Sequence, residues 1–131
     1  LSKTIARARE LGIETIACAD SLAEGTAIAA FRPDILLCEP TDLIGTGKTA
    51  DDSYTTSIVA KIRSIDPTIG IMIASGITTA DDVYRVVRLG ADGSGATSGI
   101  LSAPDPAQRI LEMAEAIMRA VAEREAQNSA A

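Results

Sequence analysis

Three short apolar runs and a fourth segment of strand length, each followed by a segment with helical periodicity, constrain this chain more than any other feature of its sequence. The apolar runs occupy residues 13–19, 34–39 and 69–74, and the fourth segment, residues 92–97, lies where a strand is expected although its strand propensity is poor. Strands that alternate with helices are joined by right-handed crossovers and form a parallel sheet. The sequence therefore predicts an α/β fold in which one helix precedes four βα units.

Capping residues indicate where the expected helices begin. Ser2 is expected to cap the first helix, and Ser21 opens a capping-box pattern before an alanine-rich helix. Thr79 occupies a similar position, and Asp105 is followed by a proline at the first helical position. The expected helices occupy residues 2–11, 22–31, 53–65, 80–89 and 106–125. Four such units form either a small open sheet or half of an eight-stranded barrel, and periodicity alone favours neither.

Composition limits both the size of the fold and its partners. A chain of 131 residues forms one domain, expected over residues 1–125, with a frayed tail over 126–131. Hydrophobic residues make up 47% and aromatic residues 2%, so the core must be aliphatic. Cys18 and Cys38 lie inside apolar runs, which predicts buried thiols in a reducing compartment.

Charge and hydropathy argue against several classes of partner. The net charge is −6 and no basic cluster is present, so nucleic acid is not an expected partner. No apolar run approaches the roughly 20 residues of a membrane span, and no signal-peptide pattern is present, so we expect a cytoplasmic protein without a membrane partner. The chain has no histidine, the commonest metal ligand, and we expect neither a metal nor a cofactor.

The segment CEPTDLIGTGKTA, residues 38–50, first suggests a nucleotide-binding loop because it ends in Gly-Lys-Thr. The phosphate-binding pattern G-x-x-x-x-G-K-[ST] requires a glycine at position 42, where this chain has Asp42. A carboxylate there would repel the phosphates that the loop should hold, and no aspartate-ended strand supplies the usual partner motif. The sequence therefore disfavours a nucleotide site.

The length of the same loop indicates a function of another kind. Thirteen residues, 40–52, separate the second strand from the next helix, where two to six are usual, and long loops of this kind often form lids. Glu39 ends the strand, so it is expected at the edge of the sheet where α/β folds place catalytic groups. Asp20 ends the first strand at the same edge, where we expect a capping or solvent-facing role.

Three segments resemble the triose-phosphate isomerase family in the correct order. Glu39-Pro40 followed by residues 43–50, LIGTGKTA, resembles strand six and the closing loop of that family, in a form similar to its archaeal branch. Residues 75–83 and 96–100 resemble the phosphate loops that follow strands seven and eight. The resemblance spans nearly the whole chain and implies the parallel (βα)₄ half of a TIM (β/α)₈ barrel, from helix four to helix eight.

The resemblance also implies roles for individual residues. In this family a glutamate base and a closing loop isomerise glyceraldehyde 3-phosphate and dihydroxyacetone phosphate, in glycolysis and gluconeogenesis, by proton transfer through an enediolate. Glu39 is then the base. The lid comprises Pro40, Ile44, Thr46, Gly47, Lys48, Thr49 and Ala50. The substrate phosphate is expected at Gly45, Gly76, Thr78, Ser98 and Gly99, held by backbone amides.

Half of the family's site has no counterpart here. The resemblance implies a further asparagine and lysine after strand one and a histidine after strand four, and none is present. The chain begins at Leu1, without a methionine and within a helical pattern, as a segment of a longer protein would. Four parallel strands expose two edges, so we expect pairing with a complementing N-terminal half or a second copy, or rearrangement to an open sheet.

Two other functions stay open on the sequence alone. The first is a non-catalytic half-barrel that binds phosphate or associates with itself. The second keeps the isomerase chemistry but takes a four-carbon ketose phosphate, because the small residues of segment 92–99, DGSGATSG, could enlarge the pocket.

Overall fold

The fold is a four-stranded parallel sheet covered by helices, seen in a computed structural model that describes residues 1–130. The strands lie side by side in chain order, β1-β2-β3-β4. This confirms the predicted α/β class and the helix followed by four βα units. The elements are α1 (Ser2–Glu10), β1 (Ile16–Ala19), α2 (Leu22–Ala29), β2 (Ile35–Cys38), the 3₁₀ helix η1 (Thr41–Leu43), α3 (Asp52–Ile65), β3 (Gly70–Ile73), α4 (Ala80–Arg88), β4 (Gly93–Ser94), α5 (Ser98–Leu101) and α6 (Pro106–Ser129).

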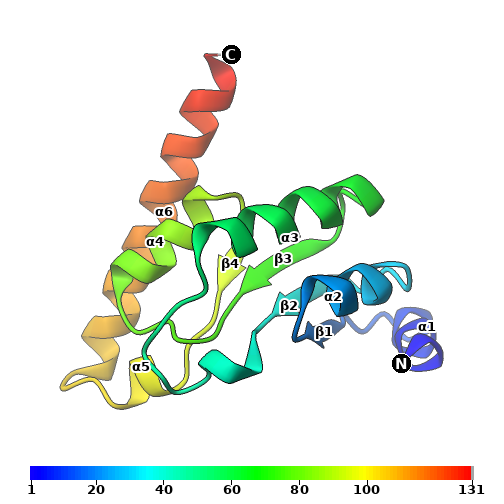
Figure 1. Cartoon of the computed structure of the whole chain (residues 1–131), viewed down its shortest axis with the longest axis horizontal. Coiled ribbons are helices and arrows are strands. Elements are labelled where there is room, and N and C mark those ends of the chain that lie inside the picture. Colours follow the sequence, from blue (N-terminus) through cyan, green and yellow to red (C-terminus); the bar gives the residue numbers. More distant parts are fainter. Residues whose placement is uncertain (131) are drawn as a thin grey trace.

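The core lies between the sheet and the helices on one of its faces (Figure 1). Alternate strand residues are buried there, among them Leu36 and Ile71, which are fully buried. Gly25 of α2 lies against the side chains of Leu36 and Ile58, so α2 and α3 share this face. The strand residues that alternate with the buried ones point to the opposite face of the sheet, and Ile16 on this opposite face is 59% exposed. Within residues 1–130 the sheet is therefore covered on one face only, as in half of a barrel.

Most of the predicted helix caps are present. The Ser21 hydroxyl accepts from the Glu24 amide at 3.3 Å, and the Asp105 carboxylate accepts from the Gln108 amide at 2.9 Å. Thr79 opens α4 with a complete capping box. The prediction for Ser2 was wrong, because α1 already includes Ser2 and its N-cap is Leu1, without a side-chain cap bond.

The fourth strand is shorter than expected. It contains only Gly93–Ser94 because glycine and serine have little intrinsic strand preference and no side chain to pack across the sheet. It pairs in parallel with β3, and the Ser94 hydroxyl adds a hydrogen bond to the Ile73 carbonyl at 2.8 Å. The backbone then leaves the sheet and enters α5, a short helix that periodicity did not predict.

Burial of the two cysteines differs from the prediction. Cys38 is fully buried, and burial, with a smaller effect from the neighbouring Cys18, raises the pKa of its thiol to about 12. Cys18 is exposed, because it lies on the edge strand β1 and points to the uncovered face of the sheet. The expectation that both thiols are buried is therefore wrong for Cys18.

Helix α6 extends beyond its predicted end. It continues to Ser129, through most of the segment expected to fray, while Ala131 of that segment lies outside the described residues. Figure 1 shows its C-terminal part projecting past the other helices. None of the helices within residues 1–130 combines the length and apolar character needed to cross a bilayer.

Candidate functional site

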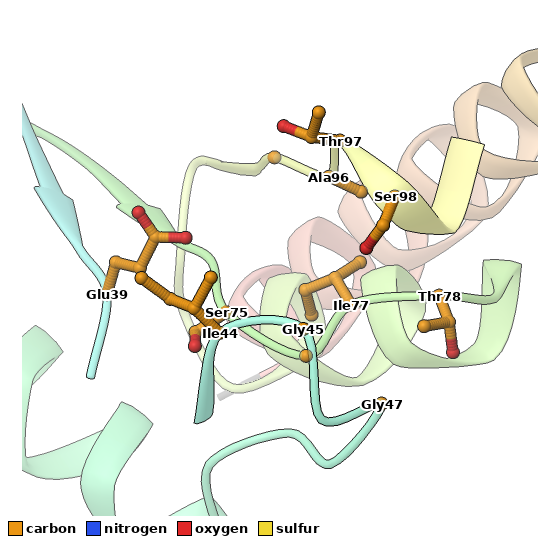
Figure 2. A pocket seen from close by; sticks show the side chains of 12 residues that line it. Glu39, Ile44, Gly45, Gly47, Ser75, Ile77, Thr78, Ala96, Thr97 and Ser98 are labelled. Atoms are coloured by element: carbon orange, nitrogen blue, oxygen red, sulfur yellow. The ribbon is translucent and has the colours of Figure 1, made fainter. Parts of the chain in front are cut away.

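The loops that follow β2, β3 and β4 surround a small hollow at the carboxyl ends of the strands (Figure 2). Predicted residues from all three loops line it, although they are far apart in the sequence. They are Glu39, Ile44, Gly45, Gly47, Gly76, Thr78 and Ser98. Ser75, Ile77, Gly95, Ala96 and Thr97 line it as well. They lie in the segments expected to form the phosphate loops or to enlarge the pocket, but none was predicted individually as a site residue. Parallel topology explains the convergence, since all strands end at the same edge.

Glu39 is placed by the end of β2. Its amide donates to the Ala19 carbonyl at 2.9 Å, which continues the pairing of β1 with β2 for one more residue. Its side chain is half-buried and lies beside Ile44 of the lid loop in Figure 2. No hydrogen bond or ion pair joins this carboxylate to another of residues 1–130.

The lid loop folds on itself between its two ends. The Thr46 hydroxyl donates to the Leu43 carbonyl at 2.7 Å and accepts from the Lys48 amide at 3.1 Å. Gly45 and Gly47 have φ values of +72° and +69°, which non-glycine residues adopt only with strain. A Cβ at either glycine would meet nothing within 4 Å, so the tip of the lid packs against little of the described chain.

The N-terminal end of the lid is held from two neighbouring loops. Asp20, just after β1, accepts from the Thr41 amide at 2.8 Å and from its hydroxyl at 3.1 Å. Ser75, just after β3, donates its hydroxyl to the Pro40 carbonyl at 2.8 Å. Asp20 therefore caps the start of η1, which agrees with the capping role expected for it. Ser75 was missed because this contact joins residues 35 positions apart.

Two predicted phosphate-binding glycines also allow the loops to pack against one another. Gly76 has a φ of +69°, and a Cβ on it would lie 1.9 Å from the Lys48 carbonyl oxygen. A Cβ on Gly99 would lie 2.4 Å from the Ile77 carbonyl oxygen. Only glycine permits such contacts between backbone atoms. Gly99 consequently lies against the loop after β3, and it is absent from the lining of the hollow.

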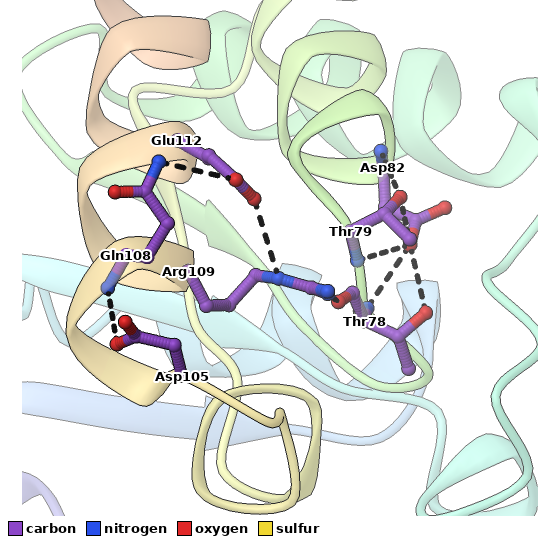
Figure 3. Close-up of polar contacts among 7 residues, drawn as sticks. All are labelled: Thr78, Thr79, Asp82, Asp105, Gln108, Arg109 and Glu112. Carbon is purple, nitrogen blue, oxygen red and sulfur yellow. Dashed lines mark hydrogen bonds and ion pairs between the residues drawn. The ribbon is translucent and has the colours of Figure 1, made fainter.

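Thr78 lies in the hollow with its own donors already engaged (Figure 3). The Asp82 carboxylate accepts from the Thr78 amide at 3.0 Å and its hydroxyl at 3.2 Å, and it also accepts from Thr79. Arg109 of α6 donates to the Thr78 carbonyl. Burial alone would raise the pKa of Asp82, but the hydrogen bonds from Thr78 and Thr79 together lower it.

The charge around the hollow is unusual for a site expected to hold an anion. Among the described residues that line the hollow there is no lysine or arginine, and Glu39 has the only carboxylate. An anion would therefore have to be held by hydroxyls and backbone amides. Ser98 is the first residue of α5, and Thr97 is the N-cap of this helix. The Thr97 side chain accepts no hydrogen bond from the helix, so it leaves the first backbone amides of α5 without a side-chain acceptor.

Four parallel strands, helices on one face and loops that line a hollow at the carboxyl ends define half of a TIM-type barrel. The model of the family described as triosephosphate isomerase matches residues 1–120, and the chain belongs to that family.

Curated relatives agree with this assignment. The chain is 34% identical over 127 residues to the triosephosphate isomerase of Metallosphaera sedula, covering 95% of this chain and 55% of that protein. It is also 34% identical over 116 residues to that of Methanobrevibacter smithii, covering 86% and 52%. For the enzyme of Sulfurisphaera tokodaii the identity is 33% over 114 residues, with coverage of 86% and 49%. The chain therefore spans about half the length of the curated relatives it matches.

Solved structures resemble the fold alone. The BexX/CysO complex of Amycolatopsis orientalis matches with a TM-score of 0.73 and 18% identity, over 95% of this chain and 50% of that one. A thiamine phosphate pyrophosphorylase from Pyrococcus furiosus matches with a TM-score of 0.69 and 19% identity, over 88% and 55%. In both, the matched region is again about half of the other chain.

Proposed function

We propose that this chain supplies the catalytic base, the lid and the phosphate-binding loops of a triosephosphate isomerase. The observation that carries the proposal is the position of Glu39. Its unengaged carboxylate follows β2 and shares one hollow with the lid and the loops after β3 and β4, in a chain of this family. Glu39 would remove a proton from the carbon beside the substrate carbonyl and return it to the neighbouring carbon, with the enediolate as intermediate.

The phosphate of the substrate would lie among Gly45, Gly76 and Ser98, held by amides and the Ser98 hydroxyl, and Gly99 would act by keeping the loops after β3 and β4 in close contact. The amide and hydroxyl of Thr78 both donate to Asp82. Thr78 would therefore bind the phosphate only if one of these donors left Asp82 and donated to the phosphate instead. The lid, from Pro40 to Ala50, would close over the bound substrate and exclude water, which strengthens each hydrogen bond to the enediolate.

A partner must complete the barrel for full activity. Two strand edges and the face that carries Ile16 lie uncovered, and the chain has no histidine to act as the family's electrophile. We propose that a complementing N-terminal half of the barrel provides the histidine and covers this face. The alternative is that a second copy of the chain covers the face, which would give a homo-oligomer. We also propose a cytoplasmic location, which the proposed sugar-phosphate substrate favours.

Absence of histidine favours a second candidate function for the chain on its own. Electrostatic stabilisation of the developing charge is usually the largest contribution to catalysis. A half-barrel with Glu39 alone would then bind a sugar phosphate and turn it over slowly or not at all.

A coupled assay for isomerisation of glyceraldehyde 3-phosphate tests the proposal. Two samples are compared: the chain alone, and the chain mixed with the N-terminal half of the Metallosphaera sedula enzyme. We expect turnover in the mixture, and a loss of about 10³-fold on Glu39→Gln, which removes the base. Asp42→Asn, in the same loop but outside the lining of the hollow, is the control. Activity that survives Glu39→Gln would contradict the role of Glu39. Absence of activity in the mixture, with phosphate binding intact, would favour the second function.

A further inference from the structure

Arg85 of α4 reaches the C-terminal end of the lid. Its Nη2 donates to the Thr49 hydroxyl at 2.8 Å and to the Ala50 carbonyl. Its Nε lies 3.3 Å from a carboxylate oxygen of Asp52, the first residue of α3. One guanidinium therefore contacts three of the four consecutive residues that join the lid to the following helix.

These contacts divide the lid into a held part and a free part. Ala50 is buried, and Asp51 caps α3 by accepting from the Tyr54 amide at 2.8 Å, so the chain from Thr49 onward is fixed to α3 and α4. Lys48 is exposed and the space beside Gly47 is open, although the Lys48 carbonyl lies against Gly76. The change from free to fixed backbone therefore falls at Lys48, and Arg85 holds the residues that follow it.

We propose that Arg85 is a positioning residue that sets the C-terminal hinge of the lid; this deepens the proposed function, in which the lid closes over a phosphate. The planar guanidinium suits the task because its donors point in several fixed directions, whereas an ammonium group offers a single centre. Without it, the Thr49 hydroxyl and the Ala50 carbonyl lose their charged donor, and the hinge spreads toward α3.

The same helix provides a matched control. Arg88, less than one turn further along α4, pairs with Glu123 of α6 at 3.4 Å and contacts no lid residue in the described chain. Replacing Arg88 removes an arginine and one ion pair from the same helix, so it reproduces the loss of charge and helix packing without affecting the hinge.

Cleavage by a lysine-specific endoproteinase tests the proposal without any need for turnover. The chain has only three lysines: Lys3 near the N-terminus, Lys48 at the hinge and Lys61 within α3. Cleavage in a native protein follows the population of locally open states. We expect Arg85→Ala to speed cleavage after Lys48 about tenfold, since hydrogen bonds to charged groups are individually strong. Arg85→Gln, which keeps an amide donor without the charge and adds no lysine, should restore part of the protection, and Arg88→Ala should stay within about twofold of the parent.

Two results would overturn the role of Arg85. One is an Arg85→Ala rate after Lys48 equal to the parent rate. The other is a parallel rise after Lys61, which would indicate general loosening of α3. Should Arg85→Ala fail to fold, Arg85→Gln and Thr49→Val decide the test, and unchanged cleavage rates in both would contradict the proposal.

Inorganic phosphate separates this inference from the proposed function. We expect phosphate to slow cleavage after Lys48 in the parent chain, and to do so less in Arg85→Ala. If phosphate changes nothing in the parent, closure of the lid over the anion is contradicted. The comparison of variants without phosphate still decides the role of Arg85.

Discussion

At the scale of single residues, glycine at the site serves two different physical needs. Gly45 and Gly47 adopt positive φ in open space, so they matter for the shape of the lid loop. Gly76 adopts positive φ and also lies against the backbone of Lys48. The first need concerns a local conformation. The second concerns the packing of two loops that sequence separates by more than 25 residues.

Gly76→Ala should therefore destabilise the chain more than an alanine at another positive-φ glycine. Gly12 is the matched control, because its φ is +68° and a Cβ there would meet nothing within 4 Å. We expect Gly12→Ala to lower the free energy of unfolding by about 1 kcal/mol and Gly76→Ala by about 3 kcal/mol or more, since the backbone must move to relieve the clash. Urea unfolding monitored by circular dichroism measures both, and equal losses would contradict the close contact.

At the scale of elements, the N-terminus of α4 is stabilised by one carboxylate with several donors. Asp82 accepts from the amides and hydroxyls of both Thr78 and Thr79, while Arg109 of α6 holds the Thr78 carbonyl. Figure 3 shows this loop between the two helices. The loop after β3 is thus fixed from both sides, which explains how a short glycine-containing turn keeps its shape beside the hollow.

The pH dependence of stability should report this carboxylate. A pKa that is lower in the folded state gives stability that is present above the unfolded value, 3.8, and is lost as pH falls through the folded value. We expect Asp82→Asn to lower the free energy of unfolding clearly at pH 7 and less at pH 3. Asp81→Asn is the control, because this neighbouring carboxylate accepts none of the hydrogen bonds from Thr78 and Thr79, and it should cost less at pH 7. A loss for Asp82→Asn that is equal at both pH values would contradict ionic capping.

At the scale of the whole molecule, the fold leaves one face of the sheet without a layer of helices. Ile16 is 59% exposed on this face, and the apolar side chains of Leu37 and Met72 are only half-buried there. Parallel sheets in α/β proteins normally have both faces covered. The same face would be the interior of a complete barrel, which agrees with coverage of about half of each curated relative.

Association through this face is open to a direct test. We expect the isolated chain to form dimers or larger species in size-exclusion chromatography with light scattering, and Ile16→Glu to shift it toward the monomer, since a charge on this face opposes burial. Ile65→Glu is the control, because Ile65 is also exposed but ends α3 on the helical side of the sheet. A monodisperse monomer of the parent chain would contradict pairing.

Local patterns were enough to predict much of this protein. Apolar runs, capping residues such as Thr79 and Asp105, and the order of elements follow from interactions within a few residues, so one helix followed by four βα units could be expected from local patterns. The half-barrel was expected only from the resemblance to the family. The family motif located the hollow and Glu39 within it. Other features depend on residues distant in the chain, and no local pattern encodes them. These are the exposure of Cys18, the hydrogen bond from Ser75 to Pro40, and the contact of Arg85 with the lid, each decided by which elements the folded chain places side by side.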